Sequence, residues 1–470
     1  MFDPLLGARL VPLNATANSF DDPSSFDSLP SARPAVTTRL GSSPPDTLWF
    51  GSRVRRAPCV HTGGLVQLAD IDLMSTEQWL HGVPHEQFAL LRREAPVFRH
   101  PRTVPGMPEY FWCLTLNDDV RMATRDPDTY SSSLGGVLLD NLQTPEEREG
   151  FRTIIDVDPP EHTRLRRLVN RAFTPRAIAE FEGQYRAAVD RILGEAMTES
   201  TFDFVPKVAS QLPAYAISEL LGVPEEDRDR IINWTNQISG GSDPEFTDGP
   251  DAPLIAATQL YEYASELAEQ RRADPRDDIV TRLITKVDDD ALGAHEFEMF
   301  VLALAFAGSE TTRTAISQGM LAFLENPAQM DLLRADPDGL APTAAEEIIR
   351  WVTPIVYFRR TATRDIELHG TRIQENDPVV LFYMSANFDE SVFSEPYEFD
   401  VTRTPNTHVA FGGGGAHMCL GAHLARLEIR VLLEELVKTT QSIEPAGPAV
   451  RLRSNWVNGL KHLPVTVVPT

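Results

Sequence analysis

The chain has few cysteines, only three among 470 residues, at Cys59, Cys113 and Cys419. Small secreted proteins that rely on disulfides carry cysteines in dense and usually even sets. Three cysteines so widely spaced predict no disulfide framework. They fit a reducing compartment, and we expect a cytoplasmic location.

Long apolar runs are also missing. A helix that crosses a membrane needs about 18 or more consecutive apolar residues, whereas the longest candidate, residues 299–307, has half that length. The first residues include an acidic side chain, Asp3, and no basic stretch before an apolar run, which argues against a signal peptide. We therefore expect no membrane anchor.

Basic residues are fewer than acidic residues. The chain carries 43 Lys and Arg against 68 Asp and Glu, a net charge of −25 at pH 7. A surface of this sign repels the phosphates of nucleic acids, so we expect no nucleic-acid partner. The hydrophobic share of 42% is ordinary for a globular protein.

Residues 1–65 differ from the rest of the chain. Proline and serine recur there, as in residues 30–34 and 41–45, and no apolar period persists. Such a segment buries too little apolar surface to fold alone. We predict a disordered or loosely packed extension, either a regulatory tail or an artefact of start-codon choice, followed by one large domain over residues 66–470.

The large domain is predicted to be mainly α-helical with small β elements. The longest helical segment, residues 294–325, ends at Asn326-Pro327 and would span about 48 Å. Strands are expected at residues 366–368 and 379–383. A segment rich in Gly, Pro and Asp at residues 240–253 is expected to be too polar for the core. Shorter helices are predicted at residues 84–94, 177–195 and 214–221.

Residues 411–421 place one cysteine, Cys419, in a glycine-rich loop before an amphipathic helix. A helix N-terminus and nearby backbone N–H groups favour the charged form of a thiol. The glycines leave room for a large flat ligand to approach the backbone. These conditions suit a thiolate that binds a haem iron. The helix is expected to begin at or just after the cysteine, because apolar residues recur at Leu420, Leu424, Leu427 and Val431.

Two other interpretations of this segment stay open. One is a glycine-rich turn with a buried structural cysteine. The other is a zinc site that uses His417, Cys419 and His423, although zinc sites usually take four ligands and no second cysteine lies nearby.

The segment resembles the haem-binding loop of the cytochrome P-450 family. That pattern has glycine four residues before the cysteine, a basic residue two before it and glycine two after it, as at Gly415, His417 and Gly421. The family usually places phenylalanine seven residues before the cysteine, but Phe411 lies eight before it. The loop is thus one residue longer, as in some actinobacterial members that oxidise sterols and branched lipids. The resemblance implies a cytochrome P-450 fold, mainly α with small β-sheets and a long central helix across the haem. It also implies that Cys419 is the axial thiolate ligand of heme b, iron protoporphyrin IX.

The centre of the long predicted helix, residues 307–312, reads Ala-Gly-Ser-Glu-Thr-Thr. Glycine costs about 1 kcal/mol there relative to alanine, threonine hydroxyls bond back to carbonyls, and a buried acid is expensive. Together these features predict a functional kink; the alternative is a solvent-facing polar turn on a surface helix. The segment resembles the family's oxygen-binding motif. That resemblance implies that Gly308 opens a groove for dioxygen, that Thr311 holds the bound oxygen by hydrogen bonds and that Glu310 relays protons.

A set of basic residues resembles the family's contacts with the haem propionates. His162 and Arg166 are four residues apart and share one face of a predicted helix. Arginine pairs with carboxylates in a fork geometry. The resemblance implies that these two residues, together with Arg360 and His417, bind the propionates. Taken singly, each reads as an ordinary surface charge.

Glu347 and Arg350 match the family's Glu-x-x-Arg pair, which Arg403 is expected to join. Their spacing allows an ion pair on one face of a helix. We assign this set to structure and not to catalysis.

Five arginines crowd one short segment of this acidic chain. They are Arg164, Arg166, Arg167, Arg171 and Arg176. One interpretation is a solvated helix face. In the family this helix lies on the thiolate side of the haem, so the resemblance implies a patch that steers a ferredoxin-type electron donor, served by its reductase.

By resemblance the protein is a monomeric monooxygenase that inserts one oxygen atom of O2 into a C–H bond of a hydrophobic substrate. The lengthened cysteine loop and residues 233–245, 307–320 and 455–461 resemble members that hydroxylate sterols and branched lipids. Terpenes, fatty acids and polyketides stay open as substrates. Two rival functions are a haem-thiolate protein that binds a ligand without turnover, and an enzyme that uses peroxide directly or rearranges its substrate. The Glu310–Thr311 pair argues against both.

Overall fold

The computed structural model describes residues 66–102, 108–139, 152–241, 243–247, 249, 251–276, 278–285 and 291–470. The chain divides into two compact units, Met1–Ala57 and Pro58–Thr470, and every described residue belongs to the second. The extension predicted at residues 1–65 lies outside the described residues. Within those residues no helix is long and apolar enough to cross a membrane.

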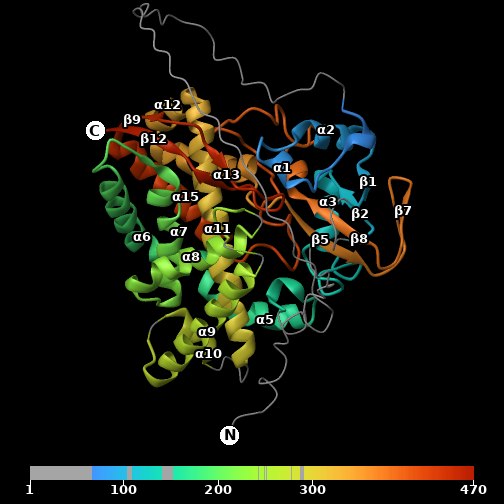
Figure 1. The fold of residues 1–470 in the computed structure, drawn as a ribbon, viewed down its shortest axis with the longest axis horizontal. Helices are drawn as coiled ribbons and strands as arrows, with labels where there is room; N and C mark the ends of the chain where they lie inside the picture. The colour runs from blue at the N-terminus through green and yellow to red at the C-terminus, as the bar shows by residue number, and fades with distance from the viewer. Residues whose placement is uncertain are drawn as a thin grey trace, which may run out of the picture. The chain divides into compact units, whose positions relative to one another are not determined.

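The described part is mainly helical with small sheets, as predicted (Figure 1). Its helices are α1 (Thr76–Trp79), α2 (His85–Glu94), α3 (Asn117–Arg125), α5 (Glu161–Val169), α6 (Pro175–Ala196), α7 (Gln211–Leu221), α8 (Arg228–Ser239), α9 (Ala252–Ala273), α10 (Ile279–Ile284), α11 (Ala294–Glu325), α12 (Pro327–Ala335), α13 (Pro337–Val352), α14 (Tyr383–Ala386) and α15 (Ala422–Thr439).

The strands are β1 (Val97–Pro101), β2 (Tyr110–Leu114), β3 (Tyr130–Ser131), β4 (Thr201–Asp203), β5 (Tyr357–Ala362), β6 (Ile366–Leu368), β7 (Thr371–Ile373), β8 (Pro378–Phe382), β9 (Thr440–Pro445), β10 (Val450–Arg451), β11 (Leu460–His462) and β12 (Pro464–Pro469). They form a five-stranded sheet in the order β1-β2-β8-β5-β3, a three-stranded sheet in the order β4-β12-β9, and two hairpins. The middle strand β8 is apolar and buried along its whole length, as expected of a strand covered on both faces.

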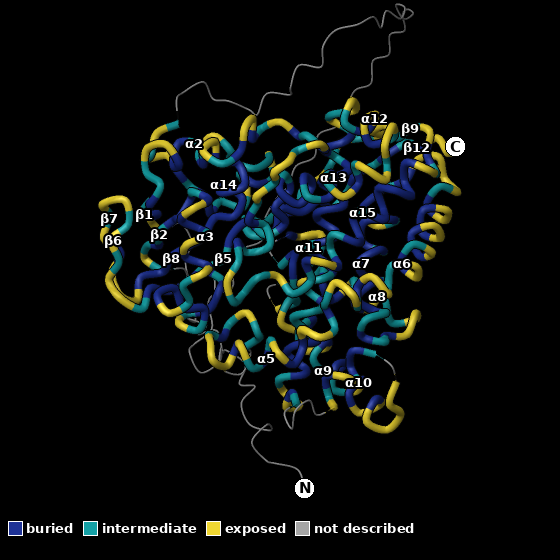
Figure 2. Tube along the Cα trace, turned by 180° about the vertical axis from the view of Figure 1, so that it is seen from behind, coloured by how far each residue is buried: buried dark blue, intermediate teal, exposed yellow. Residues whose placement is uncertain are grey.

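The long helix α11 organises the helical part of the unit. It has the predicted bounds, and Pro327 begins the next helix. Helices α7, α8, α9, α13 and α15 all pack against it. Figure 2 shows the path of α13 and α15 as mostly buried, whereas α6 turns exposed residues outward. The centre of α11 therefore lies in the interior, and the alternative of a surface helix is excluded.

The shorter predicted helices are confirmed, and their end signals act as expected. Pro84 directly precedes α2. The Oγ1 atom of Thr174 accepts a hydrogen bond from the Ala177 N–H over 3.3 Å at the start of α6. Gly222 ends α7 with a φ of 64°, a conformation that favours glycine.

The prediction that residues 240–253 stay out of the core is wrong at Asp243, which is only 1% exposed. Its carboxylate accepts a hydrogen bond from the Arg453 N–H over 3.0 Å and pairs with Lys461 Nζ at 3.0 Å. These partners compensate the buried charge. The segment between α8 and α9 is thereby fixed to β11 and the loop before it.

The set of charges assigned to structure lies in the interior. The side chains of Glu347 and Arg350 are fully buried, and Arg350 Nη2 lies 2.7 Å from Glu347 Oε1. Arg403 Nε lies 3.1 Å from the other oxygen, Oε2. Glu347 also accepts hydrogen bonds from Asn406 Nδ2 and the Asp400 N–H, each over 3.0 Å. One carboxylate thus holds the segment before the cysteine loop against α13.

Gly308 allows α7 to pack closely on α11. A Cβ atom at this position would lie 2.8 Å from Cγ1 of Ile217 on α7 and closer still to its Cδ1. Carbon atoms do not approach so closely, so helix packing alone requires the glycine. The dioxygen groove at Gly308 stays a prediction.

Replacing Glu347 with Gln is expected to lower the free energy of unfolding by about 3–5 kcal/mol, because buried guanidinium groups lose their counter-charge. Urea denaturation followed by circular dichroism measures the loss. Glu180→Gln breaks an exposed pair with Arg176 and is the control, with an expected loss below about 1 kcal/mol. Equal losses in the two variants would contradict the central role of Glu347.

Gly308→Ala is expected to cost about 1–3 kcal/mol of stability, because the added methyl group meets Ile217. Ile217→Ala in the same chain should recover part of that loss, since it removes the atoms that clash. Gly194→Ala is a matched control in α6, where a Cβ would meet no atom within 4 Å. The free energy of unfolding of this control should rise by about 1 kcal/mol because of helix propensity. A similar rise for Gly308→Ala would contradict the packing argument.

Candidate active site

A run of four glycines shapes the loop that precedes the cysteine. Gly412, Gly413, Gly414 and Gly415 have φ values of 94°, 67°, 110° and 79°, which side chains rarely adopt. A Cβ at Gly415 would press on the backbone of Thr124 in α3. The loop therefore lies directly on α3, and substitution of these glycines would move it away.

A hydrogen bond joins Cys419 to Phe411, the first residue of the cysteine loop. The Cys419 N–H donates a hydrogen bond to the Phe411 carbonyl over 2.9 Å. The Phe411 ring lies 4.5 Å from the Arg426 guanidinium and 5.6 Å from the His408 ring. The extra residue of the loop thus leaves this ring beside α15. That helix begins at Ala422, three residues beyond the cysteine.

Cys419 and Cys113, the two cysteines that the structure describes, are both free thiols; Cys113 is buried and Cys419 is exposed. Burial nevertheless raises the pKa of the Cys419 thiol, against the opposing effects of the Gly421 N–H, Arg166 and Arg426. Both observations fit a side chain that is enclosed by protein and faces an open space. The neutral thiol is favoured until a cation binds to it, so the helix terminus contributes less than the sequence indicates.

Four basic side chains gather from three parts of the fold, α5, β5 and the cysteine loop. The rings of His162 and His417 lie 4.2 Å apart. Burial lowers the pKa of His417 to about 3, with further contributions from Arg360 and His162. Burial and the charge of Arg166 lower the pKa of His162. The structure therefore brings together His162, Arg166, Arg360 and His417 as the sequence predicts, in a region that disfavours further positive charge.

Within the part of the chain that the structure describes, the two arginines of this cluster have no carboxylate partner. Arg166 is influenced by Cys419 and by no described carboxylate, and Arg360 Nη1 donates a hydrogen bond to the Arg359 carbonyl over 2.7 Å. Asp158 faces the histidines, but other groups already satisfy its charge. Burial acts to raise its pKa, whereas hydrogen bonds from Ser131, Ser132 and Ser133 lower its pKa below the ordinary value. Buried charge without a partner is costly. The cluster is therefore suited to a ligand that carries carboxylates.

The structure gives no support to the zinc interpretation. The described residues contain no group of three or more His, Cys, Asp or Glu side chains that could hold a metal ion. The set of His417, Cys419 and His423 is thus not assembled as a zinc site.

The centre of α11 is open on one side only. Ala307 is exposed and Thr311 is half-buried, whereas Ser309, Glu310 and Thr312 are buried. The Thr311 hydroxyl donates a hydrogen bond to the Ala307 carbonyl over 2.7 Å. An accessible face in the middle of an interior helix indicates a space inside the protein. Residues 307–312 nevertheless stay helical throughout.

Glu310 points away from that open face. Its Oε1 atom accepts a hydrogen bond from Arg313 Nη2 over 2.6 Å, and its Oε2 atom accepts one from Ser239 Oγ over 3.0 Å. Thr314 Oγ1 lies 3.3 Å from Oε1. The structure therefore does not join Glu310 to Thr311 by a hydrogen bond. The contacts of Glu310 with Arg313 and Ser239 were not predicted from the sequence. For Arg313 the available signal was its position three residues after the acid, a spacing that allows an ion pair on one helix face.

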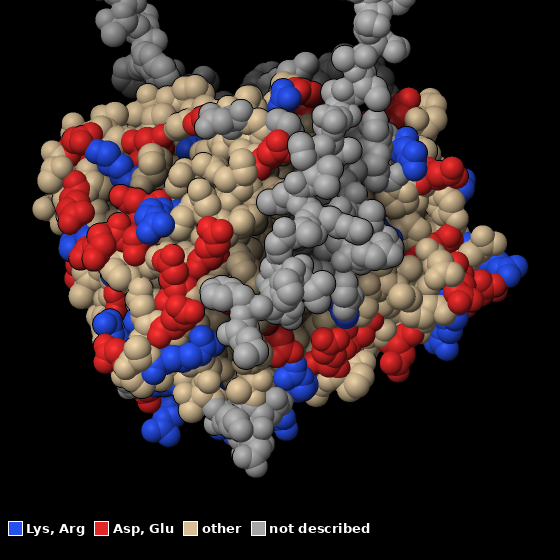
Figure 3. All heavy atoms as spheres, turned by 60° about the horizontal axis from the view of Figure 1, so that its bottom comes forward, with Lys and Arg blue, Asp and Glu red and all other residues tan. Residues whose placement is uncertain are grey.

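The five arginines predicted to form one basic patch are divided by the fold. Arg166 is half-buried and belongs to the basic cluster, and Arg164 pairs with Glu296. Arg167, Arg171 and Arg176 are exposed. Figure 3 shows acidic and basic side chains interspersed over one face of the molecule.

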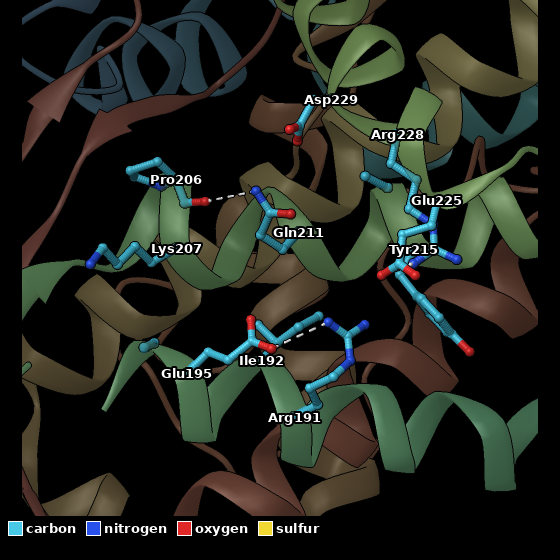
Figure 4. A pocket seen from close by; sticks show the side chains of 12 residues that line it. Arg191, Ile192, Glu195, Pro206, Lys207, Gln211, Tyr215, Glu225, Arg228 and Asp229 are labelled. Atoms are coloured by element: carbon cyan, nitrogen blue, oxygen red, sulfur yellow. Dashed lines mark hydrogen bonds and ion pairs between the residues drawn. The ribbon is translucent and has the colours of Figure 1, made fainter. Parts of the chain in front are cut away.

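A cavity of about 440 Å³ lies between α6, α7 and the start of α8, away from the cysteine (Figure 4). Two of its arginines are already paired: Arg191 lies 3.6 Å from Glu195, and Arg228 lies 2.7 Å from Glu219. No cysteine is among the residues that line it. We therefore do not assign the reaction to it.

Comparisons with known proteins agree with the site. Residues 255–447 match the model of the family described as Cytochrome P-450. The chain is 41% identical over 404 residues to a steroid C26-monooxygenase of Mycolicibacterium smegmatis, covering 84% of this chain and 93% of the relative. It is also 41% identical over 441 residues to a methyl-branched lipid omega-hydroxylase of Mycobacterium tuberculosis, covering 92% and 98%.

Solved structures show the same fold. A Mycobacterium marinum cytochrome P-450 in complex with pseudoionone superposes with a TM-score of 0.79 at 36% identity, covering 84% of this chain and 98% of that one. A Bacillus megaterium cytochrome P-450 in complex with testosterone gives 0.73 at 28% identity, covering 83% and 99%. Members of the family hold a haem through a cysteine thiolate. The chain belongs to the cytochrome P-450 family and is a haem-thiolate monooxygenase.

Proposed function

We propose that Cys419 is the axial ligand of heme b and that the enzyme hydroxylates a C–H bond of a sterol side chain or a methyl-branched lipid. The observation that carries the haem assignment is the basic cluster beside Cys419, whose arginines pair with no carboxylate among the described residues. The names of the two relatives support the substrate class.

The residues present fit this cofactor. Haem carries two propionates. Arg166 and Arg360 offer cationic donors that pair with no carboxylate among the described residues, and His162 and His417, whose pKa values are lowered, offer neutral ring N–H donors. Cys419 is the accessible thiol of the described chain, and Arg166 influences it electrostatically. The glycine loop gives the approach that a flat ligand needs. Gly308 and Thr311, on α11, would face the bound group.

When bound, the haem supplies the activation of dioxygen, which thiolate ligation promotes. In the overall reaction one oxygen atom enters a C–H bond of the substrate as hydroxyl, while the other leaves as water after uptake of two electrons and two protons. The protein must therefore deliver protons at the open face of α11. Thr311 supplies a hydroxyl there, after releasing the Ala307 carbonyl, and Glu310 is the nearby acid that relays protons to it.

An aromatic wall supports an apolar substrate. The Phe306 ring on α11 stacks on Trp456, with ring centres 5.6 Å apart and planes within 7°. Phe358 on β5 meets the same indole ring at 6.2 Å. Trp456 Nε1 donates a hydrogen bond to the Tyr357 carbonyl, which fixes its ring. All three rings are partly accessible although their elements lie inside the protein, so they offer apolar surface to a hydrocarbon.

The electrons are proposed to come from a ferredoxin-type donor with its reductase, in the cytoplasm. Arg167, Arg171 and Arg176 expose positive charge on α5, on α6 and between them, which would attract an acidic donor. The free thiols of Cys113 and Cys419 fit a reducing compartment.

Spectroscopic titration tests the proposed function. We expect the reduced carbon-monoxide complex of the purified protein to show thiolate ligation. Ferric protein should pass from low to high spin on titration with cholest-4-en-3-one or a methyl-branched fatty acid, and turnover with a ferredoxin system should give a hydroxylated product by mass spectrometry. An intact thiolate spectrum with no shift for either compound would remove this substrate class in favour of terpenes, straight-chain fatty acids or polyketides. A spectrum without thiolate ligation would overturn the assignment of Cys419.

Arg360→Gln is expected to speed the loss of haem about ten-fold, because a charge-assisted hydrogen bond to a propionate contributes about 1.5–3 kcal/mol. Transfer of haem to excess apomyoglobin measures the rate. Arg364→Gln, at an exposed arginine just beyond the same strand, is the control and should leave the rate unchanged. Equal rates in both variants would remove Arg360 from the haem contacts.

Charge reversal should show where the electron donor docks. The double variant Arg171→Glu, Arg176→Glu is expected to slow reduction by a plant-type [2Fe–2S] ferredoxin about ten-fold at low salt and to flatten the salt dependence. Stopped-flow absorbance measures both quantities. Arg276→Glu reverses an exposed charge outside this segment and is the control. Unchanged rates and salt dependence in the double variant would place the donor elsewhere.

A further inference from the structure

Arg313 is an arginine inside the protein, with only 4% of its surface exposed. It lies on α11, three residues after Glu310. One arm of its guanidinium group donates to Glu310 Oε1 over 2.6 Å, and another donates to Asn236 Oδ1 on α8. The guanidinium also lies 5.7 Å from the ring of Phe246, in the segment that follows α8. Arg313 thus contacts the acid, the helix and the segment beyond it.

The second oxygen of Glu310 is held from the same side. Ser239, the last residue of α8, donates its hydroxyl to Oε2 over 3.0 Å. Its Oγ atom also lies 2.8 Å from the Thr235 carbonyl one turn earlier. The partners of Glu310 among the described side chains therefore come from α8 and from α11 itself. Both carboxylate oxygens are occupied on the side that faces away from Thr311.

This arrangement constrains proton transfer. The side chain of Glu310 is 1% exposed, and breaking a buried ion pair is strongly unfavourable. Glu310 cannot turn toward Thr311 unless Arg313 follows it or the end of α8 withdraws. Proton delivery at the open face of α11 therefore depends on where α8 lies.

The segment after α8 is itself held in place. Gly240 folds so tightly that a Cβ there would lie 2.7 Å from the side chain of Phe246. Three residues after Gly240, Asp243 pairs with Lys461 on β11 at 3.0 Å. Glu245 lies 2.7 Å from the same lysine nitrogen. The end of α8 is thus a fixed point from which Arg313 can orient the acid.

We propose that Arg313 is a positioning residue: it orients Glu310 against the C-terminal end of α8, so that proton relay through Glu310 is coupled to the position of α8 and the segment after it. The inference rests on the proposed function, in which Glu310 relays protons to Thr311. It adds a residue that acts through the acid, since its partners among the described residues are Glu310, Asn236 and Phe246.

The first test measures how much of the consumed NADH yields product and how much yields hydrogen peroxide. In Arg313→Gln, the share of consumed NADH recovered as hydrogen peroxide instead of product is expected to rise about ten-fold, because Glu310 loses the partner that must follow it when it turns toward Thr311. Arg313→Lys, which keeps the charge, should restore most of the wild-type ratio. In a Glu310→Gln background, Arg313→Gln should change the ratio by less than about two-fold, since the two residues act as a unit.

The second test needs no turnover. Hydrogen exchange of the backbone amides at residues 236–240 is expected to be about ten-fold faster in Arg313→Gln than in wild type, because the link between α8 and α11 is lost. Asn236→Ala, which removes only the α8 side of the link, should move exchange and peroxide release in the same direction. It is the variant of choice if Arg313→Gln does not fold. Arg191→Gln, which breaks an exposed pair on α6, is the control for both measurements.

The outcomes separate the inference from the function beneath it. If wild type couples NADH to product and Arg313→Gln leaves peroxide release unchanged, or if the effects of the Glu310 and Arg313 variants simply add, the positioning role is overturned. If wild type forms no product at all, the proposed function fails and hydrogen exchange alone decides whether Arg313 ties α8 to α11. Exchange at residues 236–240 equal to that of the control would refute that link.

Discussion

The carboxylate of Glu347 is the interaction on which the placement of the cysteine depends. It is shared between Arg350 and Arg403, and it also receives the N–H of Asp400. These bonds fix the chain that leads into the glycine loop against α13. The loop then rests on α3, because glycine alone accepts its backbone angles. The thiol is therefore positioned by a series of contacts that begins far from it in the sequence.

Charged side chains inside the protein occur in three arrangements, and each arrangement is connected with a different role. Around Glu347, opposite charges are matched and the set only supports structure. At Glu310 the match is equally close, but its partners belong to two helices, so the pair depends on their spacing. At Arg166 and Arg360 positive charge has no matching carboxylate within the described chain. Arg360 is buried and Arg166 is half-buried, so a ligand that carries carboxylates would offset the cost of their charge.

Much of the fold follows from local sequence, whereas the contacts between side chains at the site do not. The bounds of α11 could be predicted because helical periodicity runs unbroken to Asn326-Pro327. The basic cluster and the cysteine loop could be predicted because short motifs fix their chemistry. The contacts of Arg313 and the burial of Asp243 could not, since their partners lie on elements that only tertiary packing brings near. Gly308 is predicted from the motif to face a ligand, whereas its contact with Ile217 of α7 arises from tertiary packing and could not be predicted.

The ion pair between Asp243 and Lys461 has a consequence for the order in which the protein is built. The two residues are 218 positions apart, and β12, just beyond Lys461, pairs with β4. Because a ribosome makes the chain from its N-terminus, the segment after α8 is synthesised long before the strands that hold it. The contacts that fix the segment after α8 form only once residues 460–469 have emerged from the ribosome. Helices α8 and α11 are therefore made well before the strands that hold this segment in place.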